Sequence, residues 1–388
     1  VGLARSGFAA AMLLKRIGSQ VRVTDLCDNA AVSDRAYALR KESIQVELGK
    51  HSQDFIRDAD MVVASPGVEL SSQPLAWARS FGVPIYSEIE LAWRLCPARV
   101  IATTGTNGKT TVVELLARLL RADGRRVHIC GNIGNPFAGE VEKMREGDYV
   151  SLEISSFQLE TVDTFKPHIA LILNFTADHL NRYKNMEEYL EAKKRIFRNQ
   201  TSGDYLILNY MDPALKKLEK EAASKVVYFN DRENDGFNPN QRCVLKVAEV
   251  LGIARDKALE VFSQFKGLEH RLEFIAESEG IEFINDSKST NAEAGAWALE
   301  NVKRPIVLIA GGSDKGLGYG ELKGLIKNNV KYAVLIGQTR GKIKKDWEGA
   351  TAMDEAGSLA EALDKAYKHA AAGDCIMLSP MCASFDMF

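Results

Sequence analysis

The chain has 388 residues, enough for two or three domains, and its 46% hydrophobic and 26% charged residues are typical of a globular protein with buried cores. A formal net charge of −2 gives no electrostatic reason to bind nucleic acid or an anionic membrane surface, and no apolar run is long enough to cross a bilayer. The six cysteines are scattered without a Cys-x-x-Cys pair, which favours reduced thiols in a cytoplasmic protein over a disulfide framework or a zinc site.

The first part of the chain predicts an α/β unit. A glycine-containing turn from Gly2 to Gly7 precedes an Ala/Leu-rich helix, and apolar strands follow at 21–25 and 61–64. This alternation indicates a parallel sheet flanked by helices. The turn lacks the middle glycine of a dinucleotide-binding fingerprint, because Ala4 stands there, but it is still suited to hold a diphosphate.

The sequence Gly-Thr-Asn-Gly-Lys-Thr-Thr at 105–111 directly follows the apolar run 100–102 and precedes a helical pattern at 112–120. Such a loop turns its backbone N–H groups toward anionic oxygens at a helix N-terminus, which predicts phosphate binding. Lys109 adds a cation, and the hydroxyl of Thr110 is suited to an Mg²⁺ ion on the β- and γ-phosphates. The predicted phosphate-binding residues are Gly105, Thr106, Asn107, Gly108, Lys109, Thr110 and Thr111.

One position departs from the usual phosphate loop. The glycine expected five residues before the Gly-Lys pair is replaced by Thr103. The alternative interpretation is therefore an ordinary turn between a strand and a helix.

A second α/β unit begins near Ser87 and continues with strands at 149–153, 169–173 and 205–208. Glu153 stands at a strand end, where its carboxylate is a natural Mg²⁺ ligand; the alternative is a solvated or capping glutamate. The next strand is followed by Asp178 and His179, which suit metal binding or a structural role, whereas Lys193 in the helix 186–197 is typical of a solvated cationic face. The polar stretch 231–240 predicts a loop.

A third unit starts around Gly267 and carries polar clusters at strand ends. Its expected strands are 281–284, 306–310, 333–336 and 376–378, and its polar clusters are 269–271, 286–291 and 311–315. The lysines and the arginine suit an anionic substrate, and Asp286 is suited to accept a hydrogen bond from a nucleotide hydroxyl. Because strand ends of a parallel sheet lie at one edge, we expect the clusters to converge.

Together these motifs resemble the Mur ligase family of peptidoglycan synthesis over nearly the whole chain. The loop 105–111 is similar to the family's ATP loop, including its shortened glycine pattern, and folylpolyglutamate synthase shares that loop. The segments 153–160, 286–291 and 379–388 are similar to those of the members that add D-glutamate.

The resemblance implies an α/β protein with three domains. These are a Rossmann-like domain at 1–87 for the UDP substrate, a P-loop ATPase-like domain at 88–266 and a Rossmann-like domain at 267–388 for the amino acid. It implies ATP-dependent addition of D-glutamate to UDP-N-acetylmuramoyl-L-alanine in the cytoplasm with two Mg²⁺ ions. We expect a monomer with neither nucleic acid nor membrane as a partner, and a mobile hinge near 265–267.

The resemblance also implies roles for individual residues. Lys109, His179 and Lys193 are the expected catalytic residues, and Lys193 matches the lysine that the family carbamylates. The expected metal ligands are Thr110, Glu153, His179 and Lys193. Outside the loop, ATP is expected at Arg271 and Asp286. The UDP substrate is expected at Ser6, Gly7, Asp25, Ser65, Asn132, Ser155 and His179. D-glutamate is expected at Thr290, Lys315, Ser384 and Phe385.

Two positions depart from the family pattern. The His-Asn pair expected near the adenine, just before Asn240, is absent, and Leu26 replaces a hydroxyl residue after Asp25. We expect residues to be missing between Asn230 and Asn238, and both ends of the chain to be incomplete. Two other functions stay open: a related ligase such as folylpolyglutamate synthase, and a regulatory or motor ATPase without ligase activity.

Overall fold

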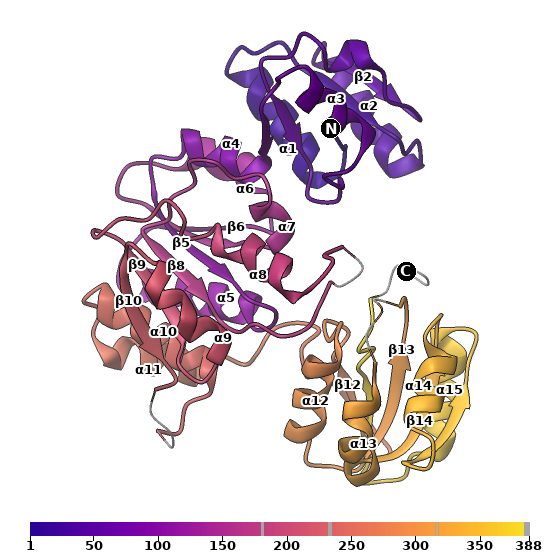
Figure 1. The fold of residues 1–388 in the computed structure, drawn as a ribbon. Helices are drawn as coiled ribbons and strands as arrows, with labels where there is room; N and C mark the ends of the chain where they lie inside the picture. Colours follow the sequence, from indigo (N-terminus) through magenta and orange to yellow (C-terminus); the bar gives the residue numbers. More distant parts are fainter. Residues whose placement is uncertain (180–181, 232–234, 315, 317, 384–388) are drawn as a thin grey trace. The chain divides into compact units, whose positions relative to one another are not determined.

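The computed structural model describes residues 1–388 except 180–181, 232–234, 315, 317 and 384–388 (Figure 1). Within it the chain forms two compact units. The first contains residues 1–175 and 187–265, and the second contains residues 176–186 and 266–388. The chain therefore passes between the units three times, at 175–176, 186–187 and 265–266.

The first residues of unit 1 form two small parallel sheets. The sheets pair β1 (Arg22–Asp25) with β2 (Gln45–Leu48) and β3 (Val62–Ala64) with β4 (Ile85–Ser87). The other elements here are α1 (Arg5–Arg16), α2 (Ala30–Lys41), the 3₁₀ helix η1 (Gln53–Phe55) and α3 (Gln73–Ser80).

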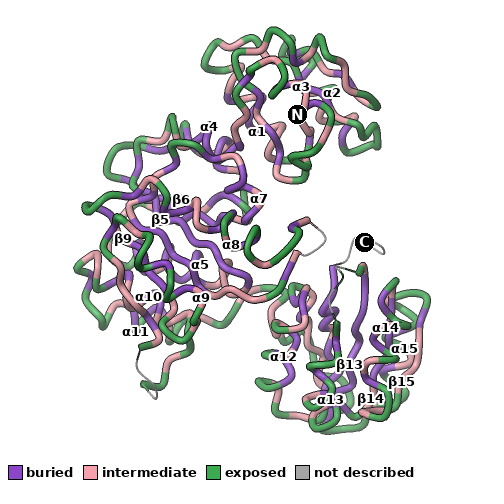
Figure 2. Tube along the Cα trace, in the orientation of Figure 1, coloured by how far each residue is buried: buried purple, intermediate pink, exposed green. Residues whose placement is uncertain are grey.

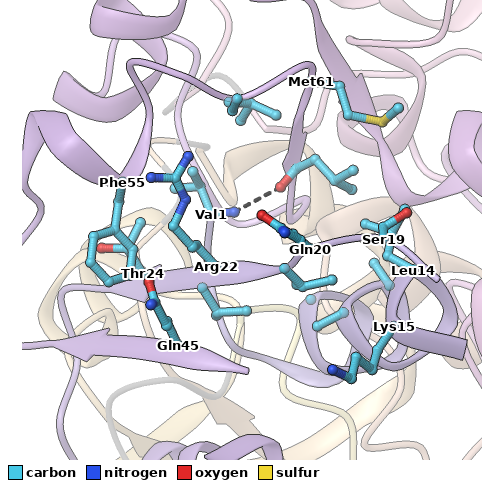
Figure 3. Close-up of a pocket in the computed structure, with 18 of the residues that line it drawn as sticks. Val1, Leu14, Lys15, Ser19, Gln20, Arg22, Thr24, Gln45, Phe55 and Met61 are labelled. Carbon is cyan, nitrogen blue, oxygen red and sulfur yellow. Dashed lines mark hydrogen bonds between the residues drawn. The ribbon is translucent and has the colours of Figure 1, made fainter. Parts of the chain in front are cut away.

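Backbone from the start of the chain lies between β1 and β3. Gly2 N–H donates to Thr24 O at 2.9 Å, and the Val1 amino group donates to Val63 O at 2.7 Å. A cavity of about 980 Å³ opens beside them, lined by β1, β3, α1 and η1 (Figure 3). None of residues 105–111 lines this cavity.

The rest of unit 1 is built on a six-stranded parallel sheet in the order β10-β9-β8-β5-β7-β6. Its strands are β5 (Arg99–Thr104), β6 (Val127–Gly131), β7 (Tyr149–Glu153), β8 (Ile169–Ile172), β9 (Tyr205–Asn209) and β10 (Lys225–Phe229). The central strands β5, β7 and β8 are almost entirely buried (Figure 2) because helices cover both faces of the sheet.

Two apolar cores fix the helices on this sheet. One face packs against α5 (Lys109–Ala122), α10 (Pro239–Val250) and α11 (Arg255–Gln264). The other packs against α4 (Glu88–Leu95), α6 (Phe137–Glu140) and α7 (Ser156–Leu159), together with α1. Shorter elements are η2 (Val141–Lys143), α8 (Met186–Lys194), α9 (Pro213–Lys216) and η3 (Lys217–Glu221).

Strand register places the candidate residues of unit 1 at one edge of the sheet. Thr103 in β5 pairs with Glu153 in β7, and Thr104 pairs with Ile172 in β8. The carboxyl ends of these parallel strands therefore converge where the loop 105–111 begins, the usual location of ligand sites in such sheets.

Unit 2 is also a layered α/β structure, with a mixed sheet in the order β11-β12-β16-β13-β14-β15. Only β11 is antiparallel to its neighbour among the described strands. The strands are β11 (Glu273–Ser278), β12 (Ile281–Asn285), β13 (Ile306–Gly311), β14 (Val330–Ile336), β15 (Ala352–Glu355) and β16 (Cys375–Leu378). The helices are α12 (Ala292–Asn301), η4 (Gly320–Leu322), α13 (Lys323–Asn329), α14 (Arg340–Asp346) and α15 (Leu359–His369).

The α/β class with parallel sheets is confirmed, and each strand expected from an apolar run is present to within a few residues. The unpredicted strands β2, β4, β6, β10, β11 and β15 all lie at sheet edges, where solvent contact permits polar residues. The loop predicted at 231–240 ends sooner, because Asn238 caps α10 with a capping box and Pro239 starts the helix. Among the described residues, no helix combines the length and apolarity needed to span a bilayer.

Candidate active site

The loop 105–111 joins β5 to α5 in the way that its sequence predicted. Gly108 is the N-cap of α5 and has a left-handed φ of +82°. A Cβ there would also lie 2.5 Å from Oδ1 of Asn240, at the start of α10. The backbone conformation therefore favours glycine at this position, and the Asn240 side chain of α10 lies close against the loop.

A chain of side-chain hydrogen bonds runs from the start of α5 through Glu153. The Thr110 hydroxyl donates to Oε2 of Glu153 at 2.8 Å, and the Asn132 amide donates to Oε1 at 2.8 Å. Asn132 N–H also donates to the Glu153 backbone carbonyl at 2.9 Å. Glu153 is only 2% exposed, so its carboxylate is fixed beside the loop rather than solvated or capping a helix.

Two lysines also meet at the loop. Lys109 Nζ donates to the carbonyl oxygens of Gly105 and Thr106 at 2.9 and 2.8 Å, and Lys193 Nζ donates to Gly105 O at 3.0 Å. Lys193 is 1% exposed, and its ammonium lies 4.5 Å from the ring centre of Tyr189. The sequence interpretation of Lys193 as part of a solvated face is therefore wrong.

Two backbone N–H groups of the loop donate to an acceptor within the protein. The side-chain oxygen of Asn174 accepts hydrogen bonds from the backbone N–H groups of Thr106 at 2.9 Å and Asn107 at 2.8 Å. The prediction that consecutive N–H groups turn toward phosphate therefore needs correction for these two residues, which have a protein acceptor.

Near the start of the chain, Ser6 and Gly7 lie in the first turn of α1. A Cβ on Gly7 would lie 1.9 Å from the Gly2 carbonyl oxygen, so the backbone of the turn and the first turn of α1 are in close contact. The Ser65 hydroxyl donates to the same carbonyl at 3.0 Å. The structure thus brings Ser6, Gly7 and Ser65 to one turn.

Two other residues expected at the UDP substrate already have local hydrogen bonds. The Asp25 carboxylate accepts the backbone N–H groups of Leu3 at 2.5 Å and Cys27 at 2.8 Å, which ties the turn to the end of β1. Ser155 is the N-cap of α7 and forms a capping box with Gln158. Both side chains therefore fix local backbone.

In unit 2, Asp286 lies near Arg271 just after β12. Its carboxylate accepts the Ser379 hydroxyl at 2.8 Å and the Leu272 N–H at 3.2 Å. Burial raises the pKa of Asp286 to about 6, although these bonds and the Arg271 charge favour its ionised form. Thr290 follows and is partly exposed.

His179 belongs to unit 2 and has a left-handed φ of +56°. Its N–H donates to Oδ1 of Asp178 at 2.8 Å, and the amide of Asn291, the N-cap of α12, lies 3.4 Å from Oδ2. The remaining residues expected at D-glutamate, Lys315, Ser384 and Phe385, lie outside the described residues.

Comparisons with known proteins cover the whole chain. Residues 1–87 match the model of the Mur ligase MurD-like N-terminal domain, 103–272 that of the Mur ligase middle domain, and 270–382 that of the Mur ligase glutamate ligase domain. A UDP-N-acetylmuramoylalanine--D-glutamate ligase from Caldanaerobacter subterraneus is 40% identical over all of this chain and 93% of its own length. The chain belongs to the Mur ligase family.

Further relatives support this assignment. The enzyme of the same name from Acidobacterium capsulatum is 38% identical over the whole chain and 92% of its own length. Among solved structures, the UDP-N-acetylmuramate-alanine ligase of Thermotoga maritima aligns with a TM-score of 0.62 at 20% identity, covering 98% of this chain and 94% of the other. The three-domain Mur ligase fold is thereby confirmed, and this Mur ligase is an ATP-dependent amide ligase.

The donor set at the loop of this Mur ligase fits an Mg²⁺ ion. Thr110 and Glu153 offer a hydroxyl and a carboxylate in contact, the oxygen types that Mg²⁺ prefers. In the described part of the chain no three His, Cys, Asp or Glu side chains cluster as a metal site.

Sequence reasoning assigned no role to two asparagines of this Mur ligase. Asn174 stands directly after an apolar strand, a signal that could have marked it as a strand-end residue beside β5. Asn240, which lies against Gly108, could be placed only from the packing of α10 on α5.

Proposed function

We propose that this Mur ligase adds D-glutamate to UDP-N-acetylmuramoyl-L-alanine in the cytoplasm and consumes ATP. The observation that carries the proposal is the full-length match, at 40% identity, to a relative named for D-glutamate ligation. The fixed arrangement of Thr110, Glu153 and Lys109 around residues 105–111 supports the ATP half of the reaction.

The reaction has two steps. The L-alanine carboxylate attacks the γ-phosphorus of ATP, so that a P–O bond forms to the acyl oxygen and ADP leaves. The amine of D-glutamate then attacks the acyl carbon, and phosphate leaves from the tetrahedral intermediate as the amine loses a proton. Activation is needed because a free carboxylate is a poor electrophile.

The residues of unit 1 would hold ATP and offset its charge. Lys109 would leave the carbonyls of Gly105 and Thr106 to pair with a phosphate, and the first turn of α5 would add N–H donors. Thr110 and Glu153 would hold one Mg²⁺, and a second would be held by Lys193, once carbamylated, together with His179 of unit 2. When bound, the two ions supply charge stabilisation for phosphoryl transfer.

We also keep the three domains proposed from the sequence, 1–87, 88–266 and 267–388, and the substrate contacts proposed for them. Arg271 and Asp286 would contact ATP from the third domain. Ser6, Gly7, Asp25, Ser65, Asn132 and Ser155, with His179, would contact the UDP substrate. Thr290, Lys315, Ser384 and the Phe385 backbone would hold D-glutamate.

An assay of phosphate release tests the function. Release should require UDP-N-acetylmuramoyl-L-alanine and D-glutamate together, and mass spectrometry should detect the amide product. Turnover with folate, or with L-glutamate equally well, would overturn the proposed specificity. ATP hydrolysis that is independent of any amino acid and gives no amide product would favour a plain ATPase.

A further inference from the structure

Asn174 follows β8 and makes three side-chain hydrogen bonds to the loop 105–111. Its Oδ1 accepts the N–H groups of Thr106 at 2.9 Å and Asn107 at 2.8 Å, and its Nδ2 donates to the Asn107 carbonyl at 3.1 Å. The Asn174 backbone carbonyl lies 3.2 Å from the Thr106 N–H as well. Asn174 thus pairs with two N–H donors and one carbonyl acceptor in the first half of the loop.

These bonds join segments that are 67 and 68 residues apart in the chain. The adjacent pairing of β5 with β8 brings them together, because Thr104 pairs with Ile172 and Leu173 N–H donates to Thr104 O. The sheet therefore places Asn174 beside the loop, where its side chain and its carbonyl bind the residues that precede Gly108.

We propose that Asn174 is a positioning residue for nucleotide binding, a role that rests on the ATP-binding function proposed for residues 105–111. Asn174 accepts hydrogen bonds from two backbone N–H groups that precede Gly108 and Lys109. These bonds hold the loop in the conformation that presents the start of α5 to phosphate. Removing the side chain takes away the two hydrogen bonds to the N–H groups of Thr106 and Asn107 and the one to the Asn107 carbonyl, and with them part of what holds the loop in place. The loop is then free to adopt conformations that do not bind phosphate.

The chemistry of the contact requires a neutral amide. Aspartate keeps an acceptor for the two N–H groups but loses the donor to the Asn107 carbonyl and adds a negative charge beside the phosphate site. Leucine keeps a similar size and loses all three bonds. Replacing Asn174 by leucine and by aspartate therefore separates the loss of the bonds from the added charge.

Asn209 at the end of β9 is a matched control on the neighbouring strand. Its Nδ2 donates to the Leu173 carbonyl at 3.1 Å, and its Oδ1 accepts from Met211 N–H at 3.1 Å and from the Asn230 amide at 3.2 Å. It makes as many side-chain bonds as Asn174 but none of these bonds reaches the loop.

The experiment measures ADP binding in the presence of Mg²⁺ by calorimetry for the whole protein, with binding of the UDP substrate and thermal unfolding alongside. Asn174→Leu should raise the Kd for ADP at least tenfold, the change expected for about 1.4 kcal/mol. Asn209→Leu should leave that Kd within about threefold of the starting protein despite a similar loss of thermal stability. UDP-substrate affinity should be unchanged in both.

Each outcome decides a different point. If the unchanged protein does not bind ADP, the proposed ATP site fails. If it does, and both Asn174→Leu and Asn174→Asp bind ADP as the control does, the positioning role is overturned. Should Asn174→Leu fail to fold, Asn174→Ala against Asn209→Ala decides, because alanine adds no charge: weaker ADP binding only in the former supports the role, and equal binding overturns it.

Discussion

The ammonium groups of Lys109 and Lys193 donate to one acceptor, the carbonyl oxygen of Gly105, at 2.9 and 3.0 Å. The two nitrogens are therefore no more than about 6 Å apart, where like charges repel by about 3 kcal/mol at an effective dielectric constant of about 20. Carbamylation of Lys193 would replace this repulsion with attraction. The neutral amine would attack carbon dioxide, form an N–C bond and release a proton, which leaves an anionic oxygen ligand.

We expect Lys193 to carry one carbon dioxide unit and its alanine variant to lose nearly all activity. Lys193→Ala should regain part of that activity when short carboxylic acids are added, because they restore an anionic oxygen in the vacated space. Lys194→Ala is the control, since Lys194 is paired with Glu191 and Glu221 away from the loop. Full activity of Lys193→Ala without added acid would rule out the ligand role.

Glu153→Gln should shift the Mg²⁺ dependence of the reaction. Glutamine keeps the oxygen that accepts the Asn132 amide but removes the negative charge next to Thr110. We expect half-maximal activity at a Mg²⁺ concentration at least tenfold higher, together with weaker Mn²⁺ binding by electron paramagnetic resonance. Glu160→Gln, a change at another buried acid of the same segment, serves for comparison. Identical Mg²⁺ titrations for the two variants would contradict the assignment.

The sequence was sufficient for the parts of this site that depend on local pattern. The loop 105–111 follows an apolar strand and opens a helix, so its place at a strand end could be predicted. The environment of Lys193 could not, because its burial depends on how α8 packs beside the loop. Asn174 likewise acts on residues that only the pairing of β5 with β8 brings near. Polar residues at the end of an apolar strand predict where a site lies. Which side chains contact one another within that site depends on tertiary packing.

The glycines at the two ends of α5 provide a paired test of the loop. Gly108 and Gly124 both have left-handed φ values, +82° and +78°, but only Gly108 has a close neighbour where a Cβ would stand. Gly124→Ala should cost about 1 kcal/mol of stability through backbone strain and leave nucleotide binding intact. Gly108→Ala should in addition displace the Asn240 side chain from its place against the loop and raise the Kd for ADP by tenfold or more, as calorimetry would measure. Equal ADP affinities in the two variants would show that nucleotide binding does not need glycine at position 108.

Two glutamates of α4 predict opposite dependences of stability on pH. Burial raises the pKa of Glu88 to about 7, only partly offset by the N–H of Ala138 at 2.5 Å, and its other oxygen has no hydrogen-bond partner among the described residues. For Glu90 burial also opposes ionisation, but hydrogen bonds from Thr164 and Arg94 outweigh it and lower the pKa.

The sign of each effect follows from proton binding. Between its ordinary pKa and about 7, folded Glu88 holds a proton that the unfolded chain has lost, so the free energy of unfolding falls as pH rises, by at most about 3 kcal/mol. Glu88→Gln should therefore be more stable than the starting protein at pH 8. Glu90 contributes stability above its unfolded pKa that is lost on acidification, so Glu90→Gln should be less stable at pH 8. Urea unfolding of both variants across this pH range would measure the difference, and a Glu88→Gln variant destabilised at pH 8 would show that its carboxylate is favourably held.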